Sequence, residues 1–63
     1  MPEHLTEREE QVISLVAHGL ANKAIARELG ISPDRVKAIV HQICVKLDAE
    51  NRTEACFKWA RAQ

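Results

Sequence analysis

The sequence contains few of the residues that build large or chemically specialised proteins. Among 63 residues there is no tyrosine, one phenylalanine and one tryptophan, so the core must be mainly aliphatic. The only two cysteines, Cys44 and Cys56, do not form a Cys-x-x-Cys pair, which argues against a zinc site. We expect two buried, reduced thiols. A disulfide would require the helices to bring their Cα atoms within about 7 Å, which the sequence does not decide.

Long apolar runs and leader patterns are also missing. No apolar stretch approaches the roughly 18 residues needed to cross a bilayer, and no signal-peptide pattern opens the chain. We therefore expect a cytoplasmic protein without a membrane partner, folded as a single domain over residues 1–63. No nucleophile–base pair, phosphate-cradling glycine loop or suitably placed carboxylate pair stands out. Neither enzymatic activity nor a cofactor is expected.

The chain has no surplus charge of either sign, because nine basic residues balance nine acidic ones. Nucleic-acid binders usually carry a basic surplus, since neutralisation of phosphates dominates their affinity. The distribution is uneven, however. Residues 22–63 carry eight basic and five acidic residues, whereas residues 1–21 carry one basic residue, Arg8, against Glu3, Glu7, Glu9 and Glu10. The charge pattern permits DNA binding without demanding it.

Capping signals divide the chain into helices. Thr6 and Glu9 have the form of a capping box at the start of a first helix, and Gly19 can end that helix with a positive φ. Asn22 is a good N-cap for a short second helix. Gly30 ends this second helix.

The second half of the chain contains similar capping signals. Ser32, followed by a proline at the first helical position, begins a third helix over about 33–47. Asp48 then predicts a left-handed or irregular stop, and Asn51 with Glu54 predicts a second capping-box-like start. No segment alternates with period two, so the expected fold is all-α with four helices. Apolar residues expected to face inward are Val12, Ile13, Val16, Leu20, Ile25, Ala26, Leu29, Val36, Ile39, Val40, Ile43, Leu47, Ala55, Cys56, Trp59 and Ala60.

Residues 22–41 have the spacing of a helix-turn-helix. Ala26 is small enough to let two helix axes approach closely, and Gly30 tolerates the positive φ of a tight turn. Aliphatic residues on both sides of the turn can pack across the crossing. A plain helical hairpin is the alternative interpretation of the same pattern.

The helix-turn-helix interpretation predicts which side chains of the third helix face away from the core. Val36 and Ile39 are expected in the core, so the side chains on the opposite side are free to enter a major groove. We call this outward group the reading surface; it consists of Lys37, Ala38 and His41. The residues expected to hold the DNA backbone are Asn22, Lys23, Arg27 and Arg35.

These patterns resemble the LuxR-type helix-turn-helix, the C-terminal DNA-binding domain of quorum-sensing activators and many bacterial response regulators. The matching stretches are LTEREEQVISLVAHGLANKAIARELGIS, VK at 36–37, KL at 46–47 and NRTEA at 51–55. The resemblance covers about residues 4–60. It implies a four-helix domain whose third helix reads double-stranded DNA and whose fourth helix often pairs two domains on inverted half-sites.

The resemblance also assigns roles to single residues. Lys37 matches the lysine that the family commonly places against DNA, and Ala38 and His41 occupy positions that contact bases in some members. Asn22 and Lys23 match the asparagine–lysine pair that lies beside the backbone in the family. A sensory or receiver domain normally precedes this domain in a longer regulator.

The sequence departs from the family pattern mainly in the third helix. Arg35 stands where the family commonly has threonine, and residues 39–41 read Ile-Val-His where polar or basic residues are common. Val45 replaces a basic residue, and the loop at 48–50 reads Asp-Ala-Glu in place of glycine, a branched apolar residue and a basic one. The reading surface is therefore less basic than the family's usual one.

Two functions remain as hypotheses from the sequence. The first is a transcription regulator that binds DNA as a homodimer through the fourth helix, with Phe57 and Trp59 at the interface. These two residues are about 200° apart on a helix, so they cannot both face the core, and Phe57 is expected to be the exposed one. The second is a protein-binding module on a helix-turn-helix scaffold that modulates a larger regulator, suggested by the neutral charge and Val45.

Overall fold

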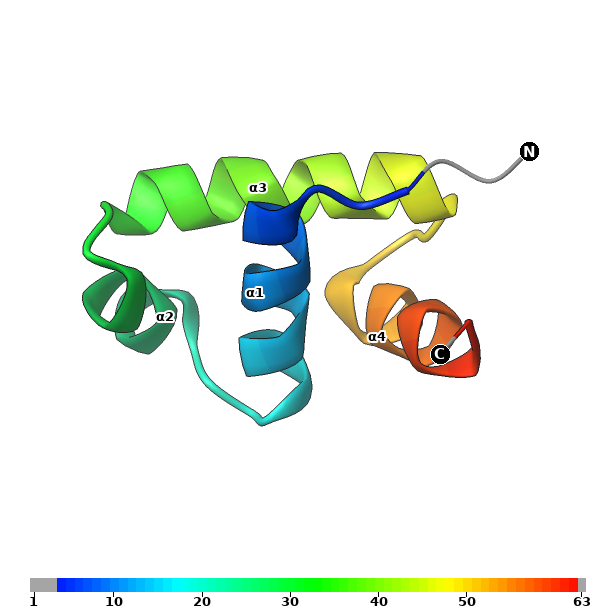
Figure 1. Cartoon of the computed structure of the whole chain (residues 1–63), viewed down its shortest axis with the longest axis horizontal. Coiled ribbons are helices and arrows are strands. Elements are labelled where there is room, and N and C mark those ends of the chain that lie inside the picture. The colour runs from blue at the N-terminus through cyan, green and yellow to red at the C-terminus, as the bar shows by residue number, and fades with distance from the viewer. Residues whose placement is uncertain (1–3, 63) are drawn as a thin grey trace.

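Four helices make up the part of the chain that the computed structural model describes, residues 4–62 (Figure 1). They are α1 (Glu7–Ala17), α2 (Asn22–Leu29), α3 (Pro33–Leu47) and α4 (Arg52–Arg61). Within these residues there is no β-strand, so the all-α prediction is confirmed. Glu3, which was counted in the acidic half, lies outside the described residues.

Local hydrogen bonds set the beginnings of α1 and α3 as the sequence predicted. The Thr6 hydroxyl accepts from the Glu9 backbone N–H at 3.2 Å, and the Glu9 carboxylate accepts from the Thr6 N–H at 2.8 Å. This reciprocal pair is a complete capping box. At α3 the Ser32 hydroxyl accepts from the Arg35 N–H at 3.1 Å. Both predicted N-caps are confirmed.

The beginning of α2 differs from the prediction. Ala21 is the N-cap and makes no side-chain hydrogen bond, while Asn22 is the first helical residue. The Asn22 side chain instead accepts a hydrogen bond from Arg52 Nη1 on α4, with an N–O distance of 2.6 Å. The assignment of Asn22 as the cap was therefore wrong, because a charged partner thirty residues away takes its carbonyl oxygen.

At the start of α4 only one of the two hydrogen bonds of the predicted capping box forms. The Asn51 side chain accepts from the Glu54 N–H at 2.8 Å, as expected. The Glu54 carboxylate does not return to the Asn51 N–H. It accepts from the N–H of Glu50, one residue earlier, at 2.6 Å.

Left-handed residues end α2 and α3. Gly30 has φ +69° and Asp48 has φ +55°, so both predicted stops are confirmed. Gly30 supplies this conformation without the Cβ clash that an L-residue meets. Asp48 is the only non-glycine residue with positive φ among residues 4–62.

The core lies where α3 crosses the other helices. In Figure 1, α3 runs along one edge of the molecule, and it contacts each of the other three helices. Most residues expected to face inward are buried or packed against the core. Ala60 is the exception because it is exposed, and Cys44 and Cys56 are only half-buried. The fully buried side chains are Val12, Ile13, Ile25, Ala26, Val36, Ile43 and Ala55.

Candidate nucleic-acid interface

The reading surface lies on the solvent side of α3. Val36 and Ile43 are fully buried and fix which side of the helix faces the core. Lys37, Ala38 and His41 are all exposed, as predicted. Val45 continues the same side of the helix and is 63% exposed. The side chains proposed to read DNA are thus accessible together along one helix.

The turn between α2 and α3 supports this arrangement. Ala26 is 3% exposed and Ile25 is completely buried at the helix crossing, so the small residue lies where a close approach needs it. The Ile31 N–H donates to the Ala26 carbonyl at 3.0 Å and closes the end of α2. The helix-turn-helix geometry is therefore present, and α3 projects along the molecular edge (Figure 1).

Three of the four expected backbone-contacting residues have free access to solvent. Lys23 and Arg27 are exposed on α2, and Arg35 is exposed in the first turn of α3. Asn22 is half-buried, and its side-chain oxygen is occupied by Arg52. Asn22 thus has a structural role that the sequence did not reveal.

A buried ion pair holds the first turn of α1 against α3. Lys46 Nζ donates to Glu9 Oε1 at 2.8 Å, and Glu9 is only 8% exposed. Burial by itself raises the pKa of Glu9, but the hydrogen bonds from Lys46 and from the Thr6 backbone more than offset this, so the pKa lies below its ordinary value. Glu9 is ionised at neutral pH and fixes one flank of α3.

Beside this ion pair lies a hollow that the sequence did not indicate. It has a volume of about 340 Å³ and opens between α1 and the first half of α3. We call it the arginine hollow. It is lined by Arg8, Ile31, Ser32, Arg35 and Ile39. The signal for Arg8 was present in the sequence, since it is the only basic residue in an otherwise acidic first turn.

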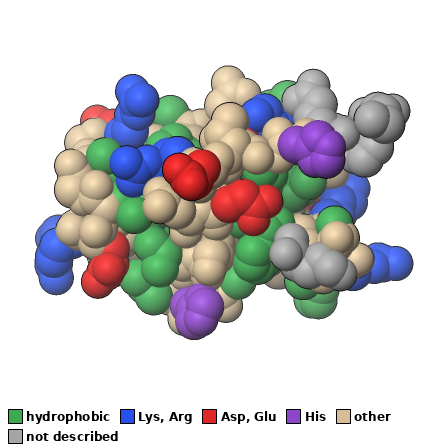
Figure 2. Space-filling view, viewed as in Figure 1, with side chains coloured by type: hydrophobic (Ala, Val, Ile, Leu, Met, Phe, Trp, Pro, Cys, Tyr) green, Lys and Arg blue, Asp and Glu red, His purple; other side chains and the backbone are tan. Residues whose placement is uncertain are grey.

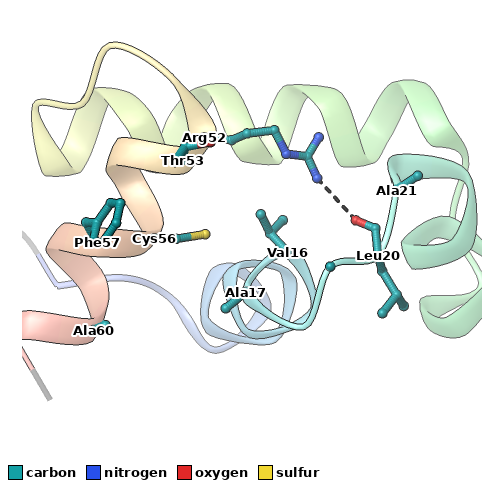
Figure 3. A pocket seen from close by; sticks show the side chains of 10 residues that line it. Val16, Ala17, Leu20, Ala21, Arg52, Thr53, Cys56, Phe57 and Ala60 are labelled. Carbon is teal, nitrogen blue, oxygen red and sulfur yellow. Dashed lines mark hydrogen bonds between the residues drawn. The ribbon is translucent and has the colours of Figure 1, made fainter.

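An apolar groove lies between the end of α1 and α4 (Figure 3). Its volume is about 700 Å³, and its lining includes Val16, Leu20 and Cys56. Phe57 stands at its edge and is 67% exposed, which confirms the expectation that Phe57 rather than Trp59 faces solvent. The Arg52 guanidinium donates to the Leu20 carbonyl at 3.4 Å across the groove (Figure 3).

The two cysteines are free thiols. Burial is the main cause that raises the pKa of both Cys44 and Cys56. A raised pKa keeps a thiol protonated at neutral pH and lowers its nucleophilicity. Their contribution is therefore apolar packing between α3 and α4.

Charges of both signs are mixed over the visible surface. Figure 2 shows acidic and basic side chains interspersed with apolar ones, without a continuous basic surface on that face. Among residues 4–62 there is no group of three or more histidine, cysteine or acidic side chains placed to hold a metal ion. Nor does any helix within the described range have the length and apolarity to cross a membrane.

Comparison with known proteins decides the family. Residues 3–58 match the family described as bacterial regulatory proteins, luxR family. The chain belongs to this family. The resemblance seen in the sequence is thereby confirmed, and so is the LuxR-type four-helix fold.

Several regulators resemble this luxR-family chain over most of its length. It is 49% identical over 51 residues to the transcriptional regulatory protein YdfI of Bacillus subtilis, covering 81% of this chain and 24% of that protein. It is 42% identical over 55 residues to the uncharacterized transcriptional regulatory protein YxjL of the same organism, covering 87% and 25%. The nitrate/nitrite response regulator NarL of Escherichia coli is 43% identical over 51 residues, covering 81% and 24%. The chain spans about a quarter of the length of these relatives.

Proposed function

We propose that this luxR-family chain is a sequence-specific DNA-binding module of a bacterial transcription regulator, with α3 in the major groove. The observation that carries the proposal is the exposed reading surface of Lys37, Ala38 and His41 on the second helix of a helix-turn-helix. An α-helix fits the major groove, which is about 12 Å wide. The names of the relatives, which are transcriptional regulators, agree with this assignment.

Each residue of the reading surface has a definite chemistry toward base edges. The Lys37 ammonium can donate to guanine O6 and N7. His41 can donate or accept a hydrogen bond, depending on its tautomer, and the Ala38 methyl can pack against a thymine methyl. Lys23, Arg27 and Arg35, together with Asn22, flank this surface and contact the phosphates that set its register.

The module acts as a homodimer through α4. A single copy with zero net charge makes few phosphate contacts, so two half-sites about one helical turn apart are needed for useful affinity. Phe57, 67% exposed beside the apolar groove, provides the contact. Trp59, the other residue expected at the interface, packs against the core and donates its indole N–H to Glu10 at 3.0 Å, so it borders the contact rather than forming its centre.

In a longer regulator, a sensory or receiver domain joined to this module controls the pairing. The support is that the chain matches only about a quarter of each relative's length. The remaining three quarters of such proteins are long enough for another domain of ordinary size.

A protein-binding module that modulates a larger regulator is the second candidate function. The exposure of Val45 favours it, because this apolar side chain lies in line with the reading surface where a basic residue would strengthen DNA binding. An apolar protein interface is much less sensitive to salt than a phosphate interface. Salt dependence therefore separates the two functions.

The test is a titration of the chain against randomised duplex DNA at about 50 and 200 mM salt, with sequencing of the bound fraction. We expect a complex that enriches an inverted repeat. A dimer making 6–10 phosphate contacts should lose a factor of about 10³–10⁵ in affinity between the two salt concentrations. A folded sample that does not bind DNA at the lower salt would contradict the proposal and favour the protein-binding module.

A substitution then tests the reading surface. Lys37→Ala should weaken binding to the enriched sequence and relax the preference at one base pair, while the melting temperature stays nearly unchanged because Lys37 is exposed. Arg61→Ala, which removes one positive charge from the last turn of α4, is the control and should keep the base preference. Equal base preference in the Lys37 variant and the wild type would refute the assignment of Lys37.

A further inference from the structure

The arginine hollow brings two positive charges together without a negative partner. Arg8 on α1 and Arg35 on α3 both line it, and both residues are exposed. Neither guanidinium makes an ion pair or a hydrogen bond with another residue in the range 4–62. Two unpaired guanidinium groups lining one hollow repel each other, so an anion bound between them would stabilise the arrangement.

The neighbouring carboxylates of α1 are directed elsewhere. Glu9 is bound to Lys46 and to the Thr6 N–H, and it is buried. Glu10 accepts from the indole N–H of Trp59 on α4. Glu7 and Glu10 remain exposed, but neither forms an ion pair with Arg8 in residues 4–62. Arg8 therefore keeps its charge available at the surface.

The backbone at the start of α3 contributes little to anion binding there. Pro33, the first helical residue, has no N–H, and the Arg35 N–H already donates to the Ser32 hydroxyl. Of the first three backbone positions of α3 only Asp34 has an N–H left, so a site in this hollow must depend mainly on the two arginine side chains. A guanidinium can hold a phosphate with two parallel hydrogen bonds.

The hollow lies on one flank of α3 and Lys37 on the other. Residues two positions apart on an α-helix are separated by about 200°, so Arg35 and Lys37 project from opposite flanks of α3. The contact between Lys46 and Glu9 confirms that α1 packs along the flank that carries Arg35. A helix seated in the major groove faces one DNA backbone on each flank.

We propose that Arg8 and Arg35 together hold one backbone phosphate, on the strand opposite to the one that Lys37 faces. This inference rests on the proposed DNA-binding function and extends its interface to α1. It assigns to Arg8, the only basic residue of an acidic helix turn, a role in DNA contact. It also gives the arginine at position 35, where threonine is common in the family, a specific partner.

The salt dependence of DNA binding tests the shared phosphate because the slope of log K against log salt counts neutralised phosphates, at about 0.9 for each. The slope is measured on the preferred duplex for the wild type, Arg8→Ala, Arg35→Ala and the double variant. We expect the double variant to lose about 0.9 from the slope for each bound copy, which is about 1.8 for a dimer on two half-sites. Its affinity relative to the wild type should then change by about 3.5-fold for each bound copy, or about 12-fold for the dimer, between 50 and 200 mM salt. Base preference should stay unchanged.

Two controls isolate the local contact from a general charge effect. Arg61→Ala removes the same charge from α4 and should leave the slope as in the wild type. Arg8→Lys keeps the charge and should restore most of the slope that Arg8→Ala loses. Because Arg8 and Arg35 are exposed and their guanidinium groups make no hydrogen bond or ion pair within residues 4–62, all variants should melt near the wild-type temperature.

The possible results separate this proposal from the proposed function. A wild-type slope retained in the double variant would overturn the phosphate site while leaving DNA binding intact. A loss of about 1.8 for each bound copy, or about 3.6 for the dimer, would show two separate phosphates and would overturn the shared site. An equal loss of slope in Arg61→Ala would show that the effect comes from net charge and would overturn the phosphate site. Absence of DNA binding by the folded wild type would refute the proposed function itself.

Discussion

Replacing Glu9 with alanine removes two non-equivalent hydrogen bonds at once. Glu9 Oε1 accepts from the Thr6 N–H at 2.8 Å, which completes the cap of α1, and from Lys46 Nζ at 2.8 Å, which ties α1 to α3. The residue is 8% exposed, so water replaces these contacts poorly. The substitution therefore affects both a local helix start and a contact between segments 37 residues apart.

The magnitude follows from the two contacts. Loss of the hydrogen bond from the Thr6 N–H, one of the two bonds of the capping box, costs about 1 kcal/mol. Breaking a fully buried ion pair costs about 3–5 kcal/mol, but the Lys46 side chain is 20% exposed and can recover part of its hydration, so we take about 1–2 kcal/mol for this contact. The total is about 2–3 kcal/mol. A chain of this length has a free energy of unfolding of about 3–9 kcal/mol, so Glu9→Ala should remove about a fifth of it or more.

The assay is urea unfolding followed by circular dichroism, together with thermal melting. Glu9→Ala should lower the melting temperature by about 15–20 °C. Glu7→Ala, an exposed residue in the same helical turn, is the matched control and should change stability by no more than about 0.5 kcal/mol. A double-mutant cycle with Lys46→Ala should give a coupling of about 1–2 kcal/mol. Equal effects of Glu9→Ala and Glu7→Ala, or a coupling near zero, would show that the contact between Glu9 and Lys46 does not stabilise the fold.

The same carboxylate predicts how stability depends on pH. The pKa of Glu9 is lowered in the folded state, so its stabilising contribution is fully present above the unfolded-state pKa of about 4.3 and is lost as the pH falls through the folded-state pKa. Stability should therefore fall as the medium is acidified from about pH 5 to below 4. In Glu9→Gln this fall should be shallower, as measured by urea unfolding across the same range. An identical pH profile in the two proteins would contradict the lowered pKa.

Three further predictions concern the helix ends. Gly30→Ala should cost about 1 kcal/mol in urea unfolding, and Gly30→Val more, because φ is +69° while an added Cβ meets no atom within 4 Å; an equal cost for Gly30→Asn would contradict a purely conformational origin. Asp48→Gly should stabilise the chain by about 0.5–1 kcal/mol, since φ is +55° and the Asp48 carbonyl that accepts from Lys58 is retained; an unchanged melting temperature would show that Asp48 is not strained. Ser32→Ala should lower the free energy of unfolding by about 1 kcal/mol and Ser32→Asp should restore it, as measured by circular dichroism melts. An unchanged stability in the alanine variant would show that the Ser32 cap does not stabilise α3.

The sequence by itself determined where most helices begin and end. The capping box of α1, the Ser32 start of α3 and the left-handed stop at Gly30 were all predicted because each depends on contacts within a few residues. The exposure of Phe57 also followed, since helix geometry alone prevents it from sharing the core side with Trp59. The reading surface was predictable for the same reason.

Only the tertiary structure decided how distant side chains pair. Asn22 looked like a cap but is held by Arg52, and Glu9 reaches Lys46 on another helix. Arg8 gave no local signal of a partnership with Arg35 until α1 was packed along the flank of α3. Local hydrogen bonds join residues a few positions apart and can be predicted from spacing, whereas hydrogen bonds across 30–37 residues depend on how whole helices cross. The helices were therefore encoded locally, and the sites between them arose from their packing.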